Sequence, residues 1–232
     1  MSAAAGLAVV TGTSRGIGRA TAIALARRGL RLLAITRDAE DRSGLAAACR
    51  DVGAASVDLM AVDLNDLEGV ERVGRELVQR FGPPSVLVHN AGEVVRASVE
   101  ELSREEWERQ LTVNLSAPFV LTRALLPSML KAKRGRILFV ASISSTLGTP
   151  RHSAYCASKW GVLGFMKSLA AEISDSGLMT AAVLPGSVDT RMLEGSGFPP
   201  RMSADEVAHT LTHFALDAPL AHNGAVIEMF GV

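Results

Sequence analysis

A tyrosine and a lysine four positions apart, Tyr155 and Lys159, are the residues of this chain best suited to chemistry. Four residues of an α-helix turn about 400°, so both side chains are expected on one face, one turn apart. A free phenol titrates near pH ~10, and a neighbouring ammonium lowers the pKa of a phenol because it stabilises the phenolate. Ser142, thirteen residues before Tyr155, supplies a hydroxyl that could orient a carbonyl oxygen. These groups predict an acid–base site able to reduce a ketone, given a hydride donor opposite.

A glycine-rich segment near the start of the chain predicts a phosphate-binding turn. The apolar run over 6–10 indicates a buried strand, and it leads into the segment TGTSRGIG, Thr11 to Gly18. A helical pattern follows, with Gly29 as its stop signal. Backbone N–H groups at such a helix start point at an anion, and glycines let it approach closely. The spacing differs from G-x-G-x-x-G, so this segment alone is weak evidence for a nucleotide site.

Taken together, the motifs are far more specific, and the chain resembles the short-chain dehydrogenase/reductase family over nearly all of its 232 residues. The resemblance is nearest to the 3-oxoacyl-acyl-carrier-protein reductases and carbonyl reductases of that family. The motifs that carry it, in chain order, are Thr11-Gly12-x-x-x-Gly16-Ile17-Gly18, Asp63-Leu64, Asn90-Ala91-Gly92, Asn114, Ser142, Tyr155-x-x-x-Lys159 and Pro185-Gly186.

The resemblance implies a catalytic tetrad of Asn114, Ser142, Tyr155 and Lys159. Tyr155 is expected to exchange the proton, with its pKa lowered by Lys159, while Ser142 orients the substrate oxygen. Asn114 is expected to link Lys159 to solvent through its backbone and a water molecule. The expected activity is NADP(H)-dependent reduction of a ketone, a 3-oxoacyl thioester or another carbonyl, to a secondary alcohol.

The resemblance also implies a cofactor site built from several separate motifs. Asp63 is expected to accept a hydrogen bond from the adenine amino group, although a helix cap is an alternative role. Pro185 and Gly186 begin a loop expected to hold the nicotinamide carboxamide. The residues expected to bind the cofactor are Gly12, Thr13, Ser14, Arg15, Gly16, Ile17, Gly18, Arg37, Asp63, Leu64, Asn90, Ala91, Gly92, Tyr155, Lys159, Pro185, Gly186, Val188 and Thr190.

Charge at the end of the second predicted strand favours NADP(H) over NAD(H). NAD-specific sites place an acid there to bind the ribose 2′-hydroxyl, but this chain has Thr36 followed by Arg37. Arg15 lies in the glycine-rich turn, and two guanidinium groups suit a 2′-phosphate. Asp38 follows one or two positions late for the NAD role and is kept as the alternative.

Alternating strand and helix patterns predict a single Rossmann-type α/β domain over residues 1–232. We expect a doubly wound parallel sheet of seven strands with helices on both faces. Ser103 and Glu106 form a capping-box pattern that opens a helix expected to pass Asn114 and reach about Lys133. Prolines 118 and 127 are expected to kink or interrupt that helix. The predicted strands are Leu7–Thr11, Arg31–Thr36, Ser56–Ala61, Val86–His89, Arg136–Ser142, Met179–Leu184 and Ala225–Met229.

Composition excludes several classes of function. Lys+Arg and Asp+Glu are both 24, so there is no net basic charge to attract nucleic acid or an anionic membrane. No apolar run of 18 residues is evident, and the N-terminus lacks the basic start of a signal peptide. The two cysteines, Cys49 and Cys156, suggest a reducing compartment. We therefore expect a cytoplasmic protein whose partner is a small carbonyl or alcohol substrate.

Two other functions fit parts of the sequence. A regulatory or scaffold protein could bind NADP on this fold without turnover, although it would have no need of the tetrad. Gly12-x-Ser14-x-Gly16 also matches the nucleophile elbow of serine hydrolases, but it follows the first strand, which leaves no earlier loop for an oxyanion hole. His209 and His213 are four apart but lack a third ligand, so no metal site is expected.

The segment 186–203 is expected to form a short lid over the substrate. In relatives this region covers the active site, and its shortness here favours an open site for an extended or bulky substrate. The C-terminal segment lacks the terminal double glycine usual in the acyl-carrier-protein reductases. The family commonly pairs long helices between subunits, so a homodimer or homotetramer is expected, with Leu163 and Phe165 as candidate contacts.

Overall fold

The computed structural model describes residues 5–37 and 44–231. Seven strands form one sheet in the order β3-β2-β1-β4-β5-β6-β7, and every neighbouring pair is parallel. The order reverses between β1 and β4, which is where α/β sheets of this type bind ligands. The strands are β1 Leu7–Thr11, β2 Arg31–Thr36, β3 Ser56–Ala61, β4 Val86–His89, β5 Gly135–Val140, β6 Leu178–Pro185 and β7 Ala225–Met229.

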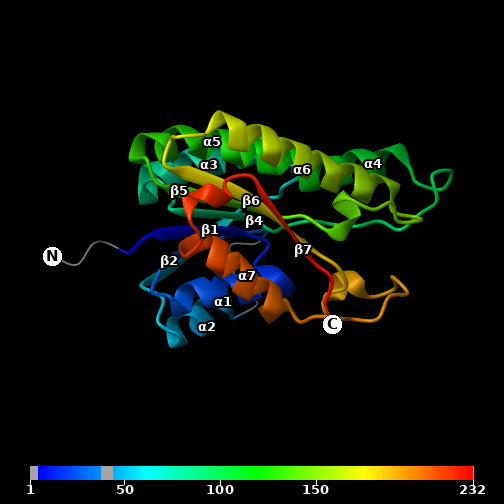
Figure 1. Ribbon diagram of the computed structural model, residues 1–232, viewed down its shortest axis with the longest axis horizontal. Helices are drawn as coiled ribbons and strands as arrows, with labels where there is room; N and C mark the ends of the chain where they lie inside the picture. The colour runs from blue at the N-terminus through cyan, green and yellow to red at the C-terminus, as the bar shows by residue number, and fades with distance from the viewer. Residues whose placement is uncertain (1–4, 38–43, 232) are drawn as a thin grey trace.

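Helices cover both faces of the sheet, as Figure 1 shows, with α3, α4, α5 and α6 on one side and α1, α2 and α7 on the other. Each face has its own apolar core, and both cores share the strands between them. The helices are α1 Gly16–Arg27, α2 Leu45–Asp51, α3 Leu67–Phe81, α4 Arg104–Leu111, α5 Ala117–Ala132, α6 Ser153–Glu172 and α7 Ala204–Leu216, with short turns η1 Thr112–Ser116, η2 Ile143–Ser145, η3 Arg191–Leu193 and η4 Leu220–His222.

The central strands are apolar at nearly every position because both of their faces are covered. All eight residues of β6 are buried, and the same holds for all five of β1. A sheet buried on both faces needs continuous apolar strands, not the alternating pattern of a half-exposed sheet. This is why the strand limits are clear in the sequence. Five of the seven predicted strands have the predicted bounds, and β5 and β6 differ by one or two residues at their ends.

The predicted end of β5 is wrong for a local reason. The strand was expected to reach Ser142 but ends at Val140. Ser142 instead caps the 3₁₀ turn η2, since its Oγ accepts a hydrogen bond from the backbone N–H of Ser144 at 3.1 Å. The side chain that the sequence marks for chemistry therefore lies just beyond the carboxyl end of a central strand.

The long helix passes Asn114 as predicted, but neither proline breaks it. It begins with the predicted capping box of Ser103 and Glu106 and ends at Ala132. Pro127 lies inside the regular helix α5. The backbone hydrogen-bond pattern changes only before Pro118, where the turn η1 is π-helical. A proline cannot donate to the carbonyl four residues earlier, here that of Asn114. A wider turn at this point is the expected adjustment.

One helix of the described chain, Arg104–Ala132, is long and apolar enough to cross a membrane by length and composition alone. Its apolar side chains have a different use here. Leu121, Leu125 and Met129 are buried in the core between this helix and the sheet. A core helix of a soluble α/β protein passes the same test, so this feature is weak evidence for a membrane span.

Candidate active site

The glycine-rich turn packs directly against the end of β4. The Thr11 hydroxyl accepts hydrogen bonds from the backbone N–H groups of Asn90 and Ala91, at 3.1 and 3.0 Å. The Asn90 amide donates to the carbonyls of Thr11 and Gly12, both at 3.0 Å. Gly12 has φ +70°, and a Cβ there would lie 2.8 Å from the Cα of Ala91. The two predicted motifs therefore form one cradle.

The helix α1 begins at this cradle, and its first turn lies against the loop after β6. A Cβ on Gly18 would lie 2.3 Å from the side-chain nitrogen of Asn90, so only glycine fits there. Gly16 has φ +55°, and a Cβ on it would lie 3.1 Å from Thr190. The buried hydroxyl of Thr13 has no hydrogen-bond partner. Closely approachable backbone at a helix start, with an unpaired hydroxyl beside it, fits the phosphates of a dinucleotide.

Gly92 joins the cradle to the tetrad. A Cβ on this glycine would lie 3.1 Å from Oδ1 of Asn114 and 3.7 Å from Nζ of Lys159. The four tetrad residues are all buried. Tyr155 and Lys159 lie on one face of α6 as predicted, with the Lys159 nitrogen 5.6 Å from the centre of the phenol ring. The structure thus places both predicted sites on the same edge of the sheet.

The pKa of the Tyr155 hydroxyl depends mainly on burial and also on neighbouring polar side chains. Burial raises the pKa of Tyr155 above its ordinary value of 10, while a hydrogen bond with Ser142 and the charge of Arg96 lower it. The net direction is upward, opposite to the lowering that we expected from Lys159. The main reason is that burial disfavours the phenolate, and Lys159 is not among the groups that shift this pKa. In this structure Tyr155 is a protonated acid at neutral pH.

Lys159 is buried and anchored to the sheet. Its ammonium donates to the carbonyl of Val140, at the end of β5, at 2.8 Å. Burial lowers the pKa of Lys159 from 10.5 to about 8. The lysine therefore keeps most of its charge at neutral pH, where it can donate to a second acceptor in the cradle.

Asn114 uses its side chain for structure and leaves its backbone for other roles. The amide nitrogen donates to the Glu93 carbonyl at 2.9 Å and to the Ser158 hydroxyl at 3.1 Å, and Oδ1 accepts from the Glu93 N–H at 2.9 Å. These bonds tie the loop after β4 to α6. The carbonyl of Asn114 lies in the π-helical turn, where Pro118 cannot donate to it.

The remaining predicted cofactor residues take positions around the same edge. Asp63 follows β3, and its carboxylate accepts from the Asn65 N–H at 2.9 Å, while Asp66 caps α3. The helix-cap alternative thus belongs to Asp66. Arg37 is exposed at the end of β2, and Asp38 lies outside the described residues. The others are exposed Ser14 and Arg15 in the turn, half-buried Ile17 in α1 and Leu64 after β3, and Pro185, Gly186 and Val188 at the end of β6 and after it.

Three polar residues near the tetrad were missed by the sequence analysis. Ser158 bridges Asn114 and the Tyr155 carbonyl, to which its hydroxyl donates at 2.7 Å. Thr11 holds the loop after β4, as described above. Arg96 acts on the Tyr155 hydroxyl through its charge. Only Thr11 falls within a quoted motif, and nothing in the spacing of Arg96 or Ser158 marks them for a role.

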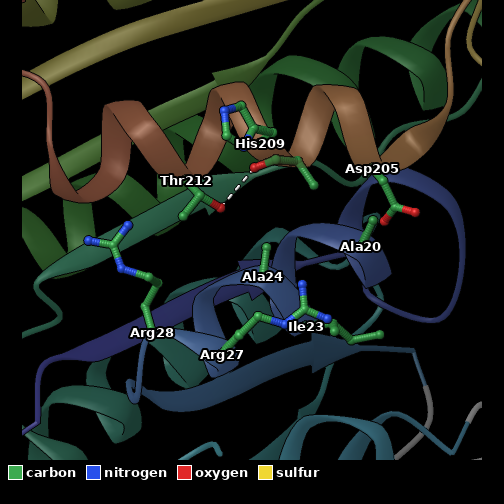
Figure 2. A pocket seen from close by; sticks show the side chains of 9 residues that line it. Ala20, Ile23, Ala24, Arg27, Arg28, Asp205, His209 and Thr212 are labelled. Atoms are coloured by element: carbon green, nitrogen blue, oxygen red, sulfur yellow. Dashed lines mark hydrogen bonds between the residues drawn. The ribbon is translucent and has the colours of Figure 1, made fainter. Parts of the chain in front are cut away.

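A surface cavity of about 460 Å³ lies away from the tetrad, between α1 and α7. Figure 2 shows Ala20 and Ala24 of α1 below Asp205, His209 and Thr212 of α7. His209 and His213 are both exposed on α7, and among the described residues no group of three potential ligands could hold a metal.

The chain belongs to the short-chain dehydrogenase family, whose sequence model matches residues 6–197. It is therefore an oxidoreductase of that family. It is 32% identical over 227 residues to the 3-oxoacyl-acyl-carrier-protein reductase of Synechocystis sp., covering 93% of this chain and 91% of that protein. It is 35% identical over 239 residues to the D-threitol dehydrogenase of Mycolicibacterium smegmatis, covering 97% and 91% of the two chains.

A solved structure agrees with this assignment. A crystal structure of a putative NAD(P)-dependent gluconate 5-dehydrogenase from Beutenbergia cavernae, with NADP bound at low occupancy, matches with a TM-score of 0.89. The two chains are 35% identical, and the match covers 97% of this chain and 95% of the other.

Proposed function

We propose that this protein is an NADP(H)-dependent reductase that converts a ketone to a secondary alcohol, with Tyr155 as the proton donor. The observation that carries the proposal is the contact of Gly92 with both Asn114 and Lys159, because it joins the phosphate cradle to the acid–base residues. A dinucleotide bound across that cradle would extend toward the tyrosine. When bound, it supplies the hydride for the carbonyl carbon.

In this mechanism the chain's own residues place the substrate and move the proton. Ser142 and Tyr155 bind the carbonyl oxygen, and the phenol donates its proton as negative charge develops there. Lys159 would hold the nicotinamide ribose and would stabilise the phenolate that remains. The Asn114 carbonyl holds a water molecule through which Lys159 exchanges protons with solvent. Because burial raises the pKa of Tyr155, the phenol is protonated at neutral pH, so the proton to be donated is present.

NADP(H) is proposed as the preferred cofactor on the basis of two exposed cations. Arg37 follows β2, and Arg15 precedes α1, at the edge where the adenosine ribose would lie. Guanidinium groups bind a phosphate dianion through paired N–H donors. The bound NADP of the Beutenbergia cavernae structure supports the same preference. Asp63 would accept from the adenine amino group, with the carboxylate oxygen not used by Asn65.

The proposed substrate class is a ketone and the corresponding secondary alcohol. The relatives named above carry the names of reductases or dehydrogenases of different compounds, which fits this broad class. The segment 186–203 is proposed as the lid, and exposed Met192 and Phe198 are its apolar side chains. Leu147, exposed beyond η2, would face them across the entrance. An open entrance of this kind would admit an extended substrate.

A cytoplasmic homodimer or homotetramer is the proposed assembly. Leu163 and Phe165, the contacts expected from the sequence, are half-buried and pack partly against the protein's own core. Exposed Trp160 and Phe119 lie beside them, with the Phe119 ring 5.7 Å from that of Phe165. These exposed aromatic side chains on α5 and α6 would make the subunit contact.

Cofactor binding and turnover test the proposal in sequence. NADPH and NADH are titrated by fluorescence, and NADPH consumption is then followed with an acetoacetyl thioester and a panel of aliphatic and aromatic ketones. We expect tighter binding of NADPH and turnover of at least one ketone. Tight binding with no turnover on any ketone would favour an NADP-binding regulatory protein instead. Binding of neither nucleotide would contradict the whole assignment.

A further inference from the structure

Arg96 is fixed at the start of the helix that carries Tyr155. The N–H of Ala97 donates to the carbonyl of Arg151 at 3.1 Å, and Ala97 pairs with His152 in an isolated parallel bridge. The carbonyl of Arg96 in turn accepts from the Arg151 side chain at 3.5 Å. Since α6 begins at Ser153, these bonds hold the backbone of Arg96 beside the first turn of that helix.

The side chain of Arg96 binds the proposed lid and also acts electrostatically on the phenol. Its guanidinium donates to the carbonyl of Met192, in the turn η3 of the segment proposed as the lid. Its positive charge acts on the Tyr155 hydroxyl. Its Nε is buried and has no hydrogen-bond partner. The guanidinium thus reaches the reacting edge of the site with donors still unused, since Met192 accepts only one of its five N–H bonds.

The charge of Arg96 is also unmatched. Among residues 5–37 and 44–231 no ion pair includes Arg96, and two acids close to it in the sequence are already paired. Glu93 binds Arg109 at 2.9 Å, and Glu101 binds Arg151 at 3.2 Å. A partly buried cation without an acid is costly, and that cost is removed when an anion binds.

We propose that Arg96 binds a carboxylate of the substrate, so that this enzyme interconverts an oxo acid and the corresponding hydroxy acid. This inference rests on the proposed function and adds the substrate class. A guanidinium offers the paired donors that a carboxylate accepts, whereas an ester or thioester would leave the charge unpaired. The carbonyl oxygen would lie at Ser142 and Tyr155, and the carboxylate would lie under Met192. The reaction balances as oxo acid, NADPH and a proton giving hydroxy acid and NADP⁺.

Paired substrates that differ only in charge test this proposal. NADPH consumption is measured with acetoacetate, levulinate and 5-oxohexanoate, and with the methyl ester of each acid. In the native enzyme we expect kcat/KM for at least one acid to exceed that of its ester at least tenfold. In Arg96→Gln we expect kcat/KM for that acid to fall roughly 10- to 100-fold, mainly through KM, as for loss of a charge-assisted bond. The ester should change less than threefold.

Arg104→Gln is the control, because Arg104 is an exposed arginine of α4 whose guanidinium is already paired with Glu108. It should leave the acid-to-ester ratio unchanged. Binding gives a second readout without turnover: titration calorimetry of the NADPH complex with the hydroxy acid should show binding to the native enzyme and weaker binding to Arg96→Gln.

Three outcomes would overturn the inference. One is equal use of acid and ester by the native enzyme. Another is an equal loss on both substrates in Arg96→Gln, which would mean that Arg96 serves only to hold Met192. The third is turnover of neutral ketones alone, which would leave the proposed reductase intact. If NADPH binds but no ketone of either kind is reduced, the proposed function itself fails and this inference fails with it.

Discussion

Asn114 binds both polar groups of the Glu93 backbone, accepting from its N–H and donating to its carbonyl, each at 2.9 Å. The Asn114 amide thus satisfies the N–H and the carbonyl of Glu93, as the backbone of a neighbouring β-strand would do. It fixes the residue directly after Gly92, which is the glycine of the cradle that lies close to Lys159. A residue expected to serve proton transfer is thus also a structural bond between β4, the long helix and α6.

Replacing Asn114 by alanine should therefore lower stability as well as activity. The change leaves the N–H and carbonyl of Glu93 unpaired and removes a partner of Ser158. We expect a loss of about 1–3 kcal/mol in the free energy of unfolding, measured by urea denaturation. Thr112→Ala in the same turn is the control, since its hydroxyl bonds only within its own helix. Equal stability of Asn114→Ala and the native protein would contradict the structural role.

Tyr155→Phe should remove catalysis while leaving cofactor binding nearly unchanged. The ring and its packing remain, and only the proton donor is lost. Because positioned acid–base groups contribute roughly 10²–10⁴-fold, kcat should fall by about that factor. Stopped-flow or steady-state NADPH consumption measures kcat, and fluorescence titration measures nucleotide affinity. Full activity in this variant would show that another group donates the proton.

Arg37→Asp should reverse part of the cofactor preference. Loss of one charge-assisted bond costs about 1.5–3 kcal/mol, so NADPH affinity should fall roughly 10- to 100-fold. The new acid can accept from a ribose 2′-hydroxyl, so NADH affinity should not fall in parallel. Parallel titrations of both nucleotides measure the ratio. The exposed Arg104, far along the chain on α4, gives the control Arg104→Asp, which should change neither affinity. Unchanged NADPH binding in Arg37→Asp would remove Arg37 from the site.

Acid should destabilise the protein through His89. This histidine is buried, stacks on Phe139 at 4.9 Å and hydrogen-bonds Thr122 at 2.8 Å. Burial lowers the pKa of His89 from 6.5 to about 3. Between these values the unfolded chain binds a proton that the folded chain does not, so stability is full above pH ~6.5 and falls as pH drops toward ~3, by up to about 4 kcal/mol.

The same stability measurements on His89→Asn isolate this effect. Asparagine keeps a polar partner for Thr122 but does not titrate in this range. We expect the unfolding free energy of the variant to depend less on pH between 6.5 and 4 than that of the native protein. His209→Asn, on the exposed surface of α7, should keep the native slope. Identical slopes in all three proteins would mean that His89 is not the titrating group.

The fold could be predicted from the sequence because the strands are buried on both faces. Continuous apolar runs such as those of β1 and β6 have clear limits, and a capping box marks the start of α4. The capping box of Ser203 and Glu206 opens α7 by the same logic. The convergence of the cradle and the tetrad followed from parallel strands that end at one edge.

The details that failed depend on contacts between distant segments. Burial is the main cause of the raised pKa of Tyr155, and burial cannot be read from the spacing of Tyr155 and Lys159. From the sequence, Pro118 and Pro127 were both expected to kink or interrupt the helix, yet they have different effects. One follows a widened turn and the other lies within a regular helix, because tertiary packing decides how each missing hydrogen bond is absorbed.

The wide turn at Thr112–Ser116 makes the long helix sensitive to the insertion or deletion of a residue. Each π-helical turn holds about one residue more than an α-helical turn, so it rotates all that follows by roughly 100°. With that rotation α4 packs on α6 and α5 packs on α3. Deleting one residue here would turn buried Leu121 and Leu125 away from the core, even if Asn114 were kept. Among related chains, insertions and deletions should therefore fall in the connecting loops and spare this segment.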